Sequence, residues 1–291
     1  MEGNIGFIGL GLLGTPMAWQ LHNRYGKRLS VWNRTREKCA PFETAGVRVC
    51  TSPRELIESS DCVILMVSDG KAAGQILGTC EHTNAYAGKT VIVMGTHAPA
   101  EQIALAKRVE GLAGSYLEAP VLGSIPQAKA RELIVMVGGS ESLFNKWQDF
   151  FKTFGDFIVR VGDVGKASSL KLALNWLIAS LTASFSLSLA YIEKSGVNHE
   201  LFMEILRKSA LYAPTFDKKL ERMLKKDFDN PNFPLKHLLK DVMLVKEEVL
   251  NASLNPLLPE SIEKIIKAGI CQGLSENDYS ALFLALLSTP K

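Results

Sequence analysis

Short apolar runs alternate with amphipathic stretches through the first half of the chain. Seven runs rich in branched and aromatic residues are predicted to be β-strands, at residues 4–10, 28–34, 61–68, 90–96, 115–121, 132–139 and 157–162. Several are almost continuously apolar, as is typical of parallel strands covered on both faces. Helical stretches lie between them, for example at 16–24 and 99–112. This alternation predicts a doubly wound α/β sheet.

The pattern changes after the GDVG segment at residues 162–165. No convincing strand follows, and the remainder is typical of helices separated by Pro, Asn and Gly near 196–198, 213–214, 229–234 and 255–259. We therefore predict an α/β domain at residues 1–164 and an all-helical domain at residues 165–291. A long helix at 165–194 is predicted to join them.

The predicted long helix contains an uncharged stretch of 21 residues, 172–192, which is long enough to span a membrane. Six of these residues are Asn, Ser or Thr, and neither flank has a marked excess of basic residues. A helix buried on most sides inside a soluble protein explains the segment equally well. We therefore predict no membrane partner.

Composition narrows the class further. The formal net charge of the 291-residue chain is +3, which is too small to indicate a nucleic-acid partner. The five cysteines, at 39, 50, 62, 80 and 271, include no CxxC motif, and the glycines at 9–14 interrupt the first apolar run too early for a signal peptide. These features predict a cytoplasmic protein with free thiols and no metal site.

The segment GLGLLG follows the first predicted strand and opens a helix. Gly9 would permit a tight turn, Gly11 would let the backbone approach a pyrophosphate, and Gly14 would let the helix pack closely on the strand. The helix start would add free N–H groups and the positive end of the helix dipole. A purely structural turn is the alternative, but the context favours a dinucleotide-binding turn that includes the intervening Leu10, Leu12 and Leu13.

The end of the second predicted strand indicates which dinucleotide binds. A site that prefers NAD usually has an acidic residue about 20 residues after the glycines, whereas this chain has Asn33, Arg34 and Thr35. Arg34 could offer a planar pair of donors to a 2′-phosphate, and Thr35 could add a hydroxyl. We therefore predict that these residues bind NADP rather than NAD. The alternative is that the arginine is an ordinary surface residue.

Lys171 and Asn175 form a candidate catalytic pair. They are four residues apart, so on a helix they project from one face. Neighbouring leucines should partly desolvate Lys171 and lower its pKa, which would suit a general acid that protonates a carbonyl oxygen while hydride arrives at the carbon. The alternative is a lysine that extends to solvent from a helix end beside an unrelated asparagine.

Six motifs, in this order, resemble those of the β-hydroxyacid dehydrogenase family: GFIGLGLLGTPMAWQL, VWNRT, GTHAP, EAPVLGS, GKASSLKLALN and FPLKHLLKDVML. The resemblance runs through nearly the whole chain. It is to 3-hydroxyisobutyrate dehydrogenase-like members, and among them most to the glyoxylate/succinic semialdehyde reductase branch. It implies a Rossmann domain, a long interdomain helix and an all-helical domain that mediates a homodimer or homotetramer.

By position, the resemblance also assigns residue roles. The catalytic lysine of the family falls on Lys171, and the asparagine that assists it falls on Asn175. Further cofactor-binding residues fall on Val67, on Thr96 after the fourth strand, and on Lys240. Without the resemblance, the Lys-Asp pair that begins at Lys240 would be interpreted as part of a helix surface.

The substrate loop departs from the family pattern, because Leu122 replaces a serine whose hydroxyl helps to bind the substrate carboxylate. Either the backbone N–H groups of Leu122 and Gly123, or Ser124, must do more, or the substrate differs. Arg131 lies where the family generally has glycine, either as a surface variation or as an added cation near the substrate. Phe233 is assigned to the substrate pocket.

These features together predict an NADP(H)-dependent oxidoreductase that interconverts a small carboxylated aldehyde and its hydroxyacid. Glyoxylate and succinic semialdehyde are the leading substrates, and 3-hydroxyisobutyrate or tartronate semialdehyde is the alternative within the class. An imine reductase would share the architecture, but Lys171 argues against it. An NADP-binding sensor or scaffold, with catalysis weakened by Leu122, is the alternative outside enzymes.

Overall fold

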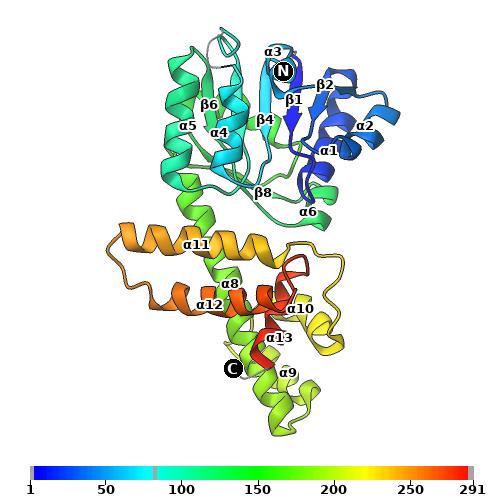
Figure 1. Ribbon diagram of the computed structural model, residues 1–291, viewed down its shortest axis with the longest axis vertical. Helices are drawn as coiled ribbons and strands as arrows, with labels where there is room; N and C mark the ends of the chain where they lie inside the picture. The colour runs from blue at the N-terminus through cyan, green and yellow to red at the C-terminus, as the bar shows by residue number, and fades with distance from the viewer. Residues whose placement is uncertain (1–2, 81–83, 288–291) are drawn as a thin grey trace. The chain divides into compact units, whose positions relative to one another are not determined.

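The computed structural model describes residues 3–80 and 84–287. The chain divides into two compact units, Met1–Lys171 and Leu172–Lys291 (Figure 1). The domain boundary expected at residue 164 stays a prediction.

A nine-stranded, mostly parallel sheet forms the centre of the first unit, and Figure 1 shows its strands beside the flanking helices. The order is β3-β2-β1-β4-β5-β6-β8-β7, with β9 pairing with β8; the pairings β6–β8 and β7–β8 are antiparallel. The strands are β1 Ile5–Ile8, β2 Leu29–Trp32, β3 Arg48–Val49, β4 Cys62–Leu65, β5 Thr90–Val93, β6 Ser115–Glu118, β7 Val121–Leu122, β8 Ile134–Gly138 and β9 Ile158–Gly162.

Helices cover both faces of this sheet, since side chains that alternate along a strand enter different hydrophobic clusters. Ile64 of β4 belongs to a cluster shared with α1, α2, α6 and α7, whereas Val63 and Leu65 belong to one shared with α3, α4 and α5. The helices are α1 Gly14–Tyr25, η1 Gly26–Arg28, η2 Arg36–Cys39, α2 Ala40–Thr44, α3 Pro53–Glu58, α4 Gly70–Gly78, α5 Pro99–Gly111, α6 Ile125–Ala130 and α7 Glu141–Phe151.

All seven predicted strands are present, and the predicted doubly wound sheet is confirmed. Two further strands, β3 and β7, were not predicted. Each has only two residues, which is too short for a hydrophobic period to be visible in the sequence.

The second unit is helical throughout its described residues, as predicted. The long helix α8, Lys166–Ser195, begins in the first unit and continues into the second. Two hydrophobic clusters pack against α8, one shared with α11 and α12 and the other with α9 and α10. The remaining elements are α9 His199–Lys208, α10 Pro214–Lys225, α11 Leu235–Asn251, α12 Leu257–Cys271, η3 Tyr279–Ala281 and α13 Leu282–Leu287.

Helix α8 is long and apolar enough to cross a membrane, but 44% of its most apolar window is buried inside this chain. The exposed residues of 172–192, among them Leu187 at 57% and Tyr191 at 70%, lie on one stripe of the helix. The other residues of this stretch are buried or half-buried, as expected for a helix buried on most sides.

A buried ion pair connects α10 to the segment before η3. Both carboxylate oxygens of Asp278 accept hydrogen bonds from the Lys219 ammonium, at 2.8 and 2.9 Å. Asp278 is fully buried, and one of its oxygens also accepts from the N–H and the hydroxyl of Ser280. Desolvation lowers the pKa of Lys219, against the opposing effect of Asp278. The pair must therefore stay intact for the fold to bury either charge.

Candidate functional site

The glycine turn between β1 and α1 has the geometry that its sequence predicts. Gly9 has φ +107°, and a Cβ there would collide with the Met66 carbonyl. A Cβ on Gly14 would collide with the Gly9 carbonyl, whereas one on Gly11 would have no described atom within 4 Å. Gly9 and Gly14 are therefore required by the fold, and Gly11 leaves backbone open to an approaching group.

Asn33 holds this turn from the end of β2. Its side-chain oxygen accepts a hydrogen bond from the Leu10 N–H at 2.8 Å, and its amide donates to the Thr35 carbonyl at 2.9 Å. Arg34 and Thr35 are exposed beyond it. Arg36 pairs with Glu43 at 3.3 Å, but Arg34 has no ion-pair partner among the described residues. The Arg34 guanidinium thus remains available to an anion near the turn.

The strand order brings other predicted cofactor residues to the same edge of the sheet. β1, β2, β4 and β5 are parallel neighbours, so their carboxyl ends share one edge, with a change of winding direction at β1. Val67 and Thr96 follow β4 and β5, and both are half-buried. A Cβ on Gly95 would collide with the Val67 carbonyl, which shows how closely these two segments approach. Open α/β sheets bind ligands at such an edge.

The predicted substrate loop begins on β7. Leu122 is half-buried and pairs with Ile134 of β8, and Gly123 has φ +139°. The Ser124 hydroxyl and N–H both donate to the Gln127 side-chain oxygen, at 2.9 and 3.0 Å, at the start of α6. Because the Ser124 hydroxyl already has this partner in the helix cap, it is a poor replacement for the absent serine at 122.

Arg131 ends helix α6 in a left-handed conformation with φ +61°. Glycine adopts this conformation without a steric penalty, whereas arginine pays a backbone cost there. The Arg131 guanidinium is exposed and donates to the Lys152 carbonyl at 3.0 Å. These contacts favour the interpretation of Arg131 as a surface variation.

Lys171 and Asn175 both lie on α8, and both are buried, with 7% and 4% exposed. Within the second unit, the Asn175 amide donates to an oxygen of Asp241 at 2.6 Å. This bond fixes the amide orientation and leaves the Asn175 carbonyl oxygen buried without a partner among the described atoms. Asp241 was noted in the sequence only as the neighbour of Lys240, and its bond to Asn175 spans 66 residues, so no local pattern could reveal it.

Lys240 and Phe233 lie in the second unit, around the same part of α11. Lys240 pairs with Asp241 at 2.9 Å. The Phe233 ring stacks on His237, with centroids 6.2 Å apart, and meets Tyr279 edge to face at 5.8 Å. These two aromatic contacts fix the position of the Phe233 ring. Desolvation, reinforced by the neighbouring lysines, lowers the pKa of His237.

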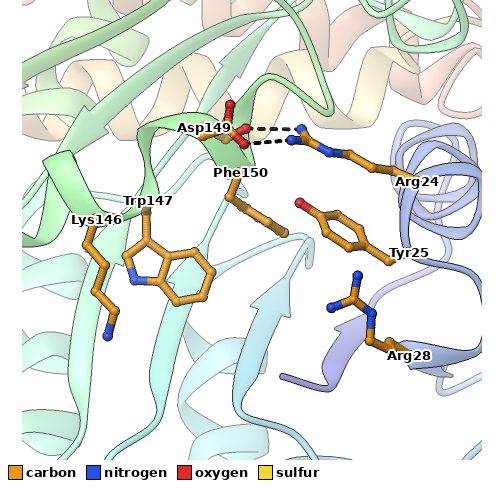
Figure 2. A pocket seen from close by; sticks show the side chains of 7 residues that line it. All are labelled: Arg24, Tyr25, Arg28, Lys146, Trp147, Asp149 and Phe150. Carbon is orange, nitrogen blue, oxygen red and sulfur yellow. Dashed lines mark hydrogen bonds and ion pairs between the residues drawn. The ribbon is translucent and has the colours of Figure 1, made fainter. Parts of the chain in front are cut away.

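A separate hollow of about 530 Å³ lies where the end of α1 and η1 meet α7. Figure 2 shows Arg24 and Arg28 on either side of Tyr25, with Trp147 across the hollow and Asp149 paired with Arg24. α1 begins at the cofactor edge of the sheet and ends at the opposite edge. The hollow is therefore distinct from the candidate site, and no predicted site residue lines it.

Comparison with known families agrees with this geometry. Residues 4–162 match the family profile described as the NAD binding domain of 6-phosphogluconate dehydrogenase. Residues 165–286 match that described as NAD-binding of NADP-dependent 3-hydroxyisobutyrate dehydrogenase. The chain belongs to the β-hydroxyacid dehydrogenase family. It is thus an oxidoreductase with an NAD(P)-binding Rossmann domain, of a family that acts on hydroxyacids and semialdehydes, and the predicted family and enzyme class are confirmed.

Individual members of the β-hydroxyacid dehydrogenase family match nearly the whole chain. It is 31% identical to glyoxylate/succinic semialdehyde reductase 1 of Arabidopsis thaliana, over 97% of this chain and 98% of that protein. It is 30% identical to the chloroplastic glyoxylate/succinic semialdehyde reductase 2 of the same plant, over 97% of this chain and 79% of that protein. The structure of Mycobacterium tuberculosis 3-hydroxyisobutyrate dehydrogenase with L-serine matches with a TM-score of 0.88 at 21% identity, over 99% of this chain and all of that one, and this likeness shows the fold.

Proposed function

We propose that the protein uses NADP(H) to interconvert a small carboxylated aldehyde and its hydroxyacid, with glyoxylate or succinic semialdehyde as substrate. The observation that carries the proposal is the pair of buried residues Lys171 and Asn175, four apart on α8, in a chain of this family. Two relatives at 30% and 31% identity are reductases of glyoxylate and succinic semialdehyde by name.

The choice of NADP(H) is supported by the ends of β1 and β2. Gly11 leaves the space that a pyrophosphate needs, and the first N–H groups of α1 would donate to it. Arg34, exposed and without an ion-pair partner in the described chain, would bind a 2′-phosphate, with the Thr35 hydroxyl as a second donor. Bound nicotinamide would supply or accept the hydride.

Lys171 is proposed as the proton donor to the carbonyl oxygen in reduction and as the acceptor of that proton in oxidation. Asn175 would assist through its carbonyl oxygen, because Asp241 occupies its amide and leaves this oxygen as an acceptor for an ammonium or hydroxyl proton. Lys240 would remain a cofactor contact. Its ion pair with Asp241 would orient its side chain.

The substrate carboxylate would bind at the loop after β7. Leu122 offers only backbone there, and the Ser124 hydroxyl is engaged with Gln127, so the N–H groups of Leu122 and Gly123 are the proposed donors. Phe233 would form an apolar wall of the pocket. A loop with few side-chain donors suits a short substrate held mainly by its carboxylate and its reacting oxygen.

The test is a steady-state screen of glyoxylate, succinic semialdehyde and tartronate semialdehyde with NADPH and NADH in parallel, and of 3-hydroxyisobutyrate, which is the reduced partner of its couple, with NADP+ and NAD+. Butyraldehyde, which lacks a carboxylate, is the control substrate. We expect turnover of a carboxylated aldehyde with NADPH and much less with butyraldehyde. Preference for 3-hydroxyisobutyrate or tartronate semialdehyde would identify that compound, and not glyoxylate or succinic semialdehyde, as the substrate. Cofactor binding without turnover on any substrate would instead favour the sensor or scaffold, which the missing hydroxyl at Leu122 makes the second candidate.

We also propose a homodimer or homotetramer formed through the helical unit, in the cytoplasm. Exposed apolar side chains occur on α8 and α9, on the segment after α11 and at the start of α12: Leu187, Tyr191, Leu201, Ile205, Leu254, Leu257 and Leu258. Burying such side chains between copies would favour association. Light scattering after gel filtration should give two or four chain masses, and a monomer at micromolar concentration would contradict the proposal.

A further inference from the structure

Glu118 is a buried carboxylate at the end of β6 that no predicted role explains. Its side chain is fully buried and reaches the start of α8, 47 to 50 residues further along the chain. One carboxylate oxygen accepts the N–H groups of Gly165 at 2.7 Å and Ala167 at 2.9 Å. The other accepts the Ser168 hydroxyl at 2.6 Å. All of these residues belong to the first unit.

These bonds do for α8 what an N-cap side chain does for other helices. The first N–H groups of a helix have no partner inside it, and a side-chain oxygen of the preceding residue usually accepts one of them. Gly165, the residue before α8, has no side chain and a φ of +98°. A Cβ there would also lie 3.2 Å from Ile103. Because position 165 is restricted to glycine, the cap must come from elsewhere, and Glu118 provides it.

The local electrostatics fit this role. Burial raises the pKa of Glu118, while the hydrogen bonds from Ser168, Ala167 and Gly165 oppose that rise. The positive end of the helix dipole adds a favourable interaction with a carboxylate at this place. Gly138, paired with Glu118 across β6 and β8, leaves the space that the side chain occupies.

We propose that Glu118 is a positioning residue for Lys171. Lys171 lies five residues after the start of α8, in the turn directly beyond the capped one. Glu118 also precedes the loop that contains Leu122 and Gly123, so one side chain ties the helix of the proton donor to the strand that leads into the substrate loop. This inference rests on the proposed function, in which Lys171 transfers the proton.

Two pairs of variants separate positioning from general stability. Glu118→Ala removes the whole cap. Glu118→Gln keeps one side-chain oxygen to accept the two N–H groups, and its amide N–H can donate a hydrogen bond to the Ser168 hydroxyl oxygen. Ser168→Ala removes the 2.6 Å bond, whereas the matched Ser169→Ala removes only a hydroxyl bonded to the Gly165 carbonyl within the helix. Ser52→Ala, which removes the N-cap of α3 in the same unit, is the control for lost stability.

We expect Glu118→Ala to lower kcat about 10- to 100-fold, the range for a catalytic group displaced by about 1 Å. The dissociation constant of NADPH should stay within about twofold, because the glycine turn is built on other elements. Glu118→Gln should restore most of kcat, and Ser168→Ala should lower kcat more than Ser169→Ala or Ser52→Ala. Equal kcat for Glu118→Ala and Ser52→Ala at equal stability would overturn the proposal.

Hydrogen exchange of the peptide covering residues 163–171 tests the cap without any need for turnover. Glu118→Ala should accelerate exchange there at least about tenfold, since two backbone N–H groups lose their acceptor, and Glu118→Gln should not. Unchanged exchange would overturn the role of Glu118 even in an active enzyme. Faster exchange in a protein with no turnover on any aldehyde would show instead that the proposed function fails while the cap is real.

Discussion

Substitution of Gly11 and of Gly14 by alanine should separate cofactor binding from folding within one turn. The two glycines are three residues apart, and the same methyl group is added in each variant. A Cβ on Gly14 would collide with the Gly9 carbonyl, whereas a Cβ on Gly11 would meet no described atom within 4 Å. The φ of Gly11 is also outside the left-handed range, so alanine fits its backbone.

The structure gives the expected magnitudes. Gly14→Ala must move backbone, which costs about 1–3 kcal/mol of unfolding free energy. Gly11→Ala should leave stability unchanged or raise it by about 0.5 kcal/mol, because alanine restricts the unfolded chain more than glycine does. In the complex the new methyl group would occupy the approach of the pyrophosphate. If it costs about 1–3 kcal/mol there too, the dissociation constant of NADPH rises about 5- to 150-fold.

Urea unfolding without cofactor measures the free energy of unfolding. Titration with NADPH, followed by calorimetry or nucleotide fluorescence, measures the dissociation constant of NADPH. Both measurements are made on both variants, so each serves as the control for the other. Unchanged NADPH affinity in a folded Gly11→Ala protein would refute a pyrophosphate contact at this turn. A strongly destabilised Gly11→Ala protein would refute the open space inferred at that position.

Lys171→Ala should lower kcat about 100-fold, as expected for loss of a positioned acid. Lys166→Ala, at an exposed position of the same helix, should not lower kcat, and equal kcat values for the two variants would show that Lys171 is not the proton donor. Arg34→Ser should raise the dissociation constant of NADPH about 10-fold or more without changing that of NADH, whereas Arg36→Ser, already paired with Glu43, should change neither. Asp278→Asn should lower the unfolding free energy by about 3 kcal/mol, because Lys219 stays buried without its counter-charge; Glu276→Gln, in an exposed pair with Lys236, should cost less than about 1 kcal/mol. Leu122→Ser should lower the KM for glyoxylate about tenfold by adding a donor to its carboxylate, and an unchanged KM would mean that this position does not contact the substrate.

Much of the fold could be predicted from the sequence because its signals are local. Apolar runs and glycine spacing located seven strands and the turn before α1, and Pro, Asn and Gly marked the breaks near the starts of α9, α10, α11 and α12. β3 and β7 were missed, because two residues carry no period. The exposed stripe of α8 that contains Leu187 and Tyr191 was not located, since composition alone cannot show which side of a helix its neighbours leave uncovered.

The candidate site divides in the same way. The roles of Gly9, Gly11 and Gly14 follow from backbone requirements that spacing reveals, and the structure gives each its own physical reason. The contacts of Asn175 with Asp241 and of Glu118 with Ser168 join segments 66 and 50 residues apart, and no pattern within one segment specifies them. They depend on which strand and helix ends the topology brings together.

The departure at Leu122 has a consequence for how activity should be measured. The glycine turn is built by β1 and α1, whereas the loop at 122–124 is built by β7 and α6. A change in the loop can therefore alter substrate choice while cofactor binding stays intact. Turnover on one aldehyde reports both properties at once, so weak turnover alone cannot distinguish a different substrate from a lost cofactor site. Measuring NADPH affinity together with turnover on a range of carboxylated aldehydes separates these two explanations. Only loss of NADPH binding would count against the dinucleotide turn.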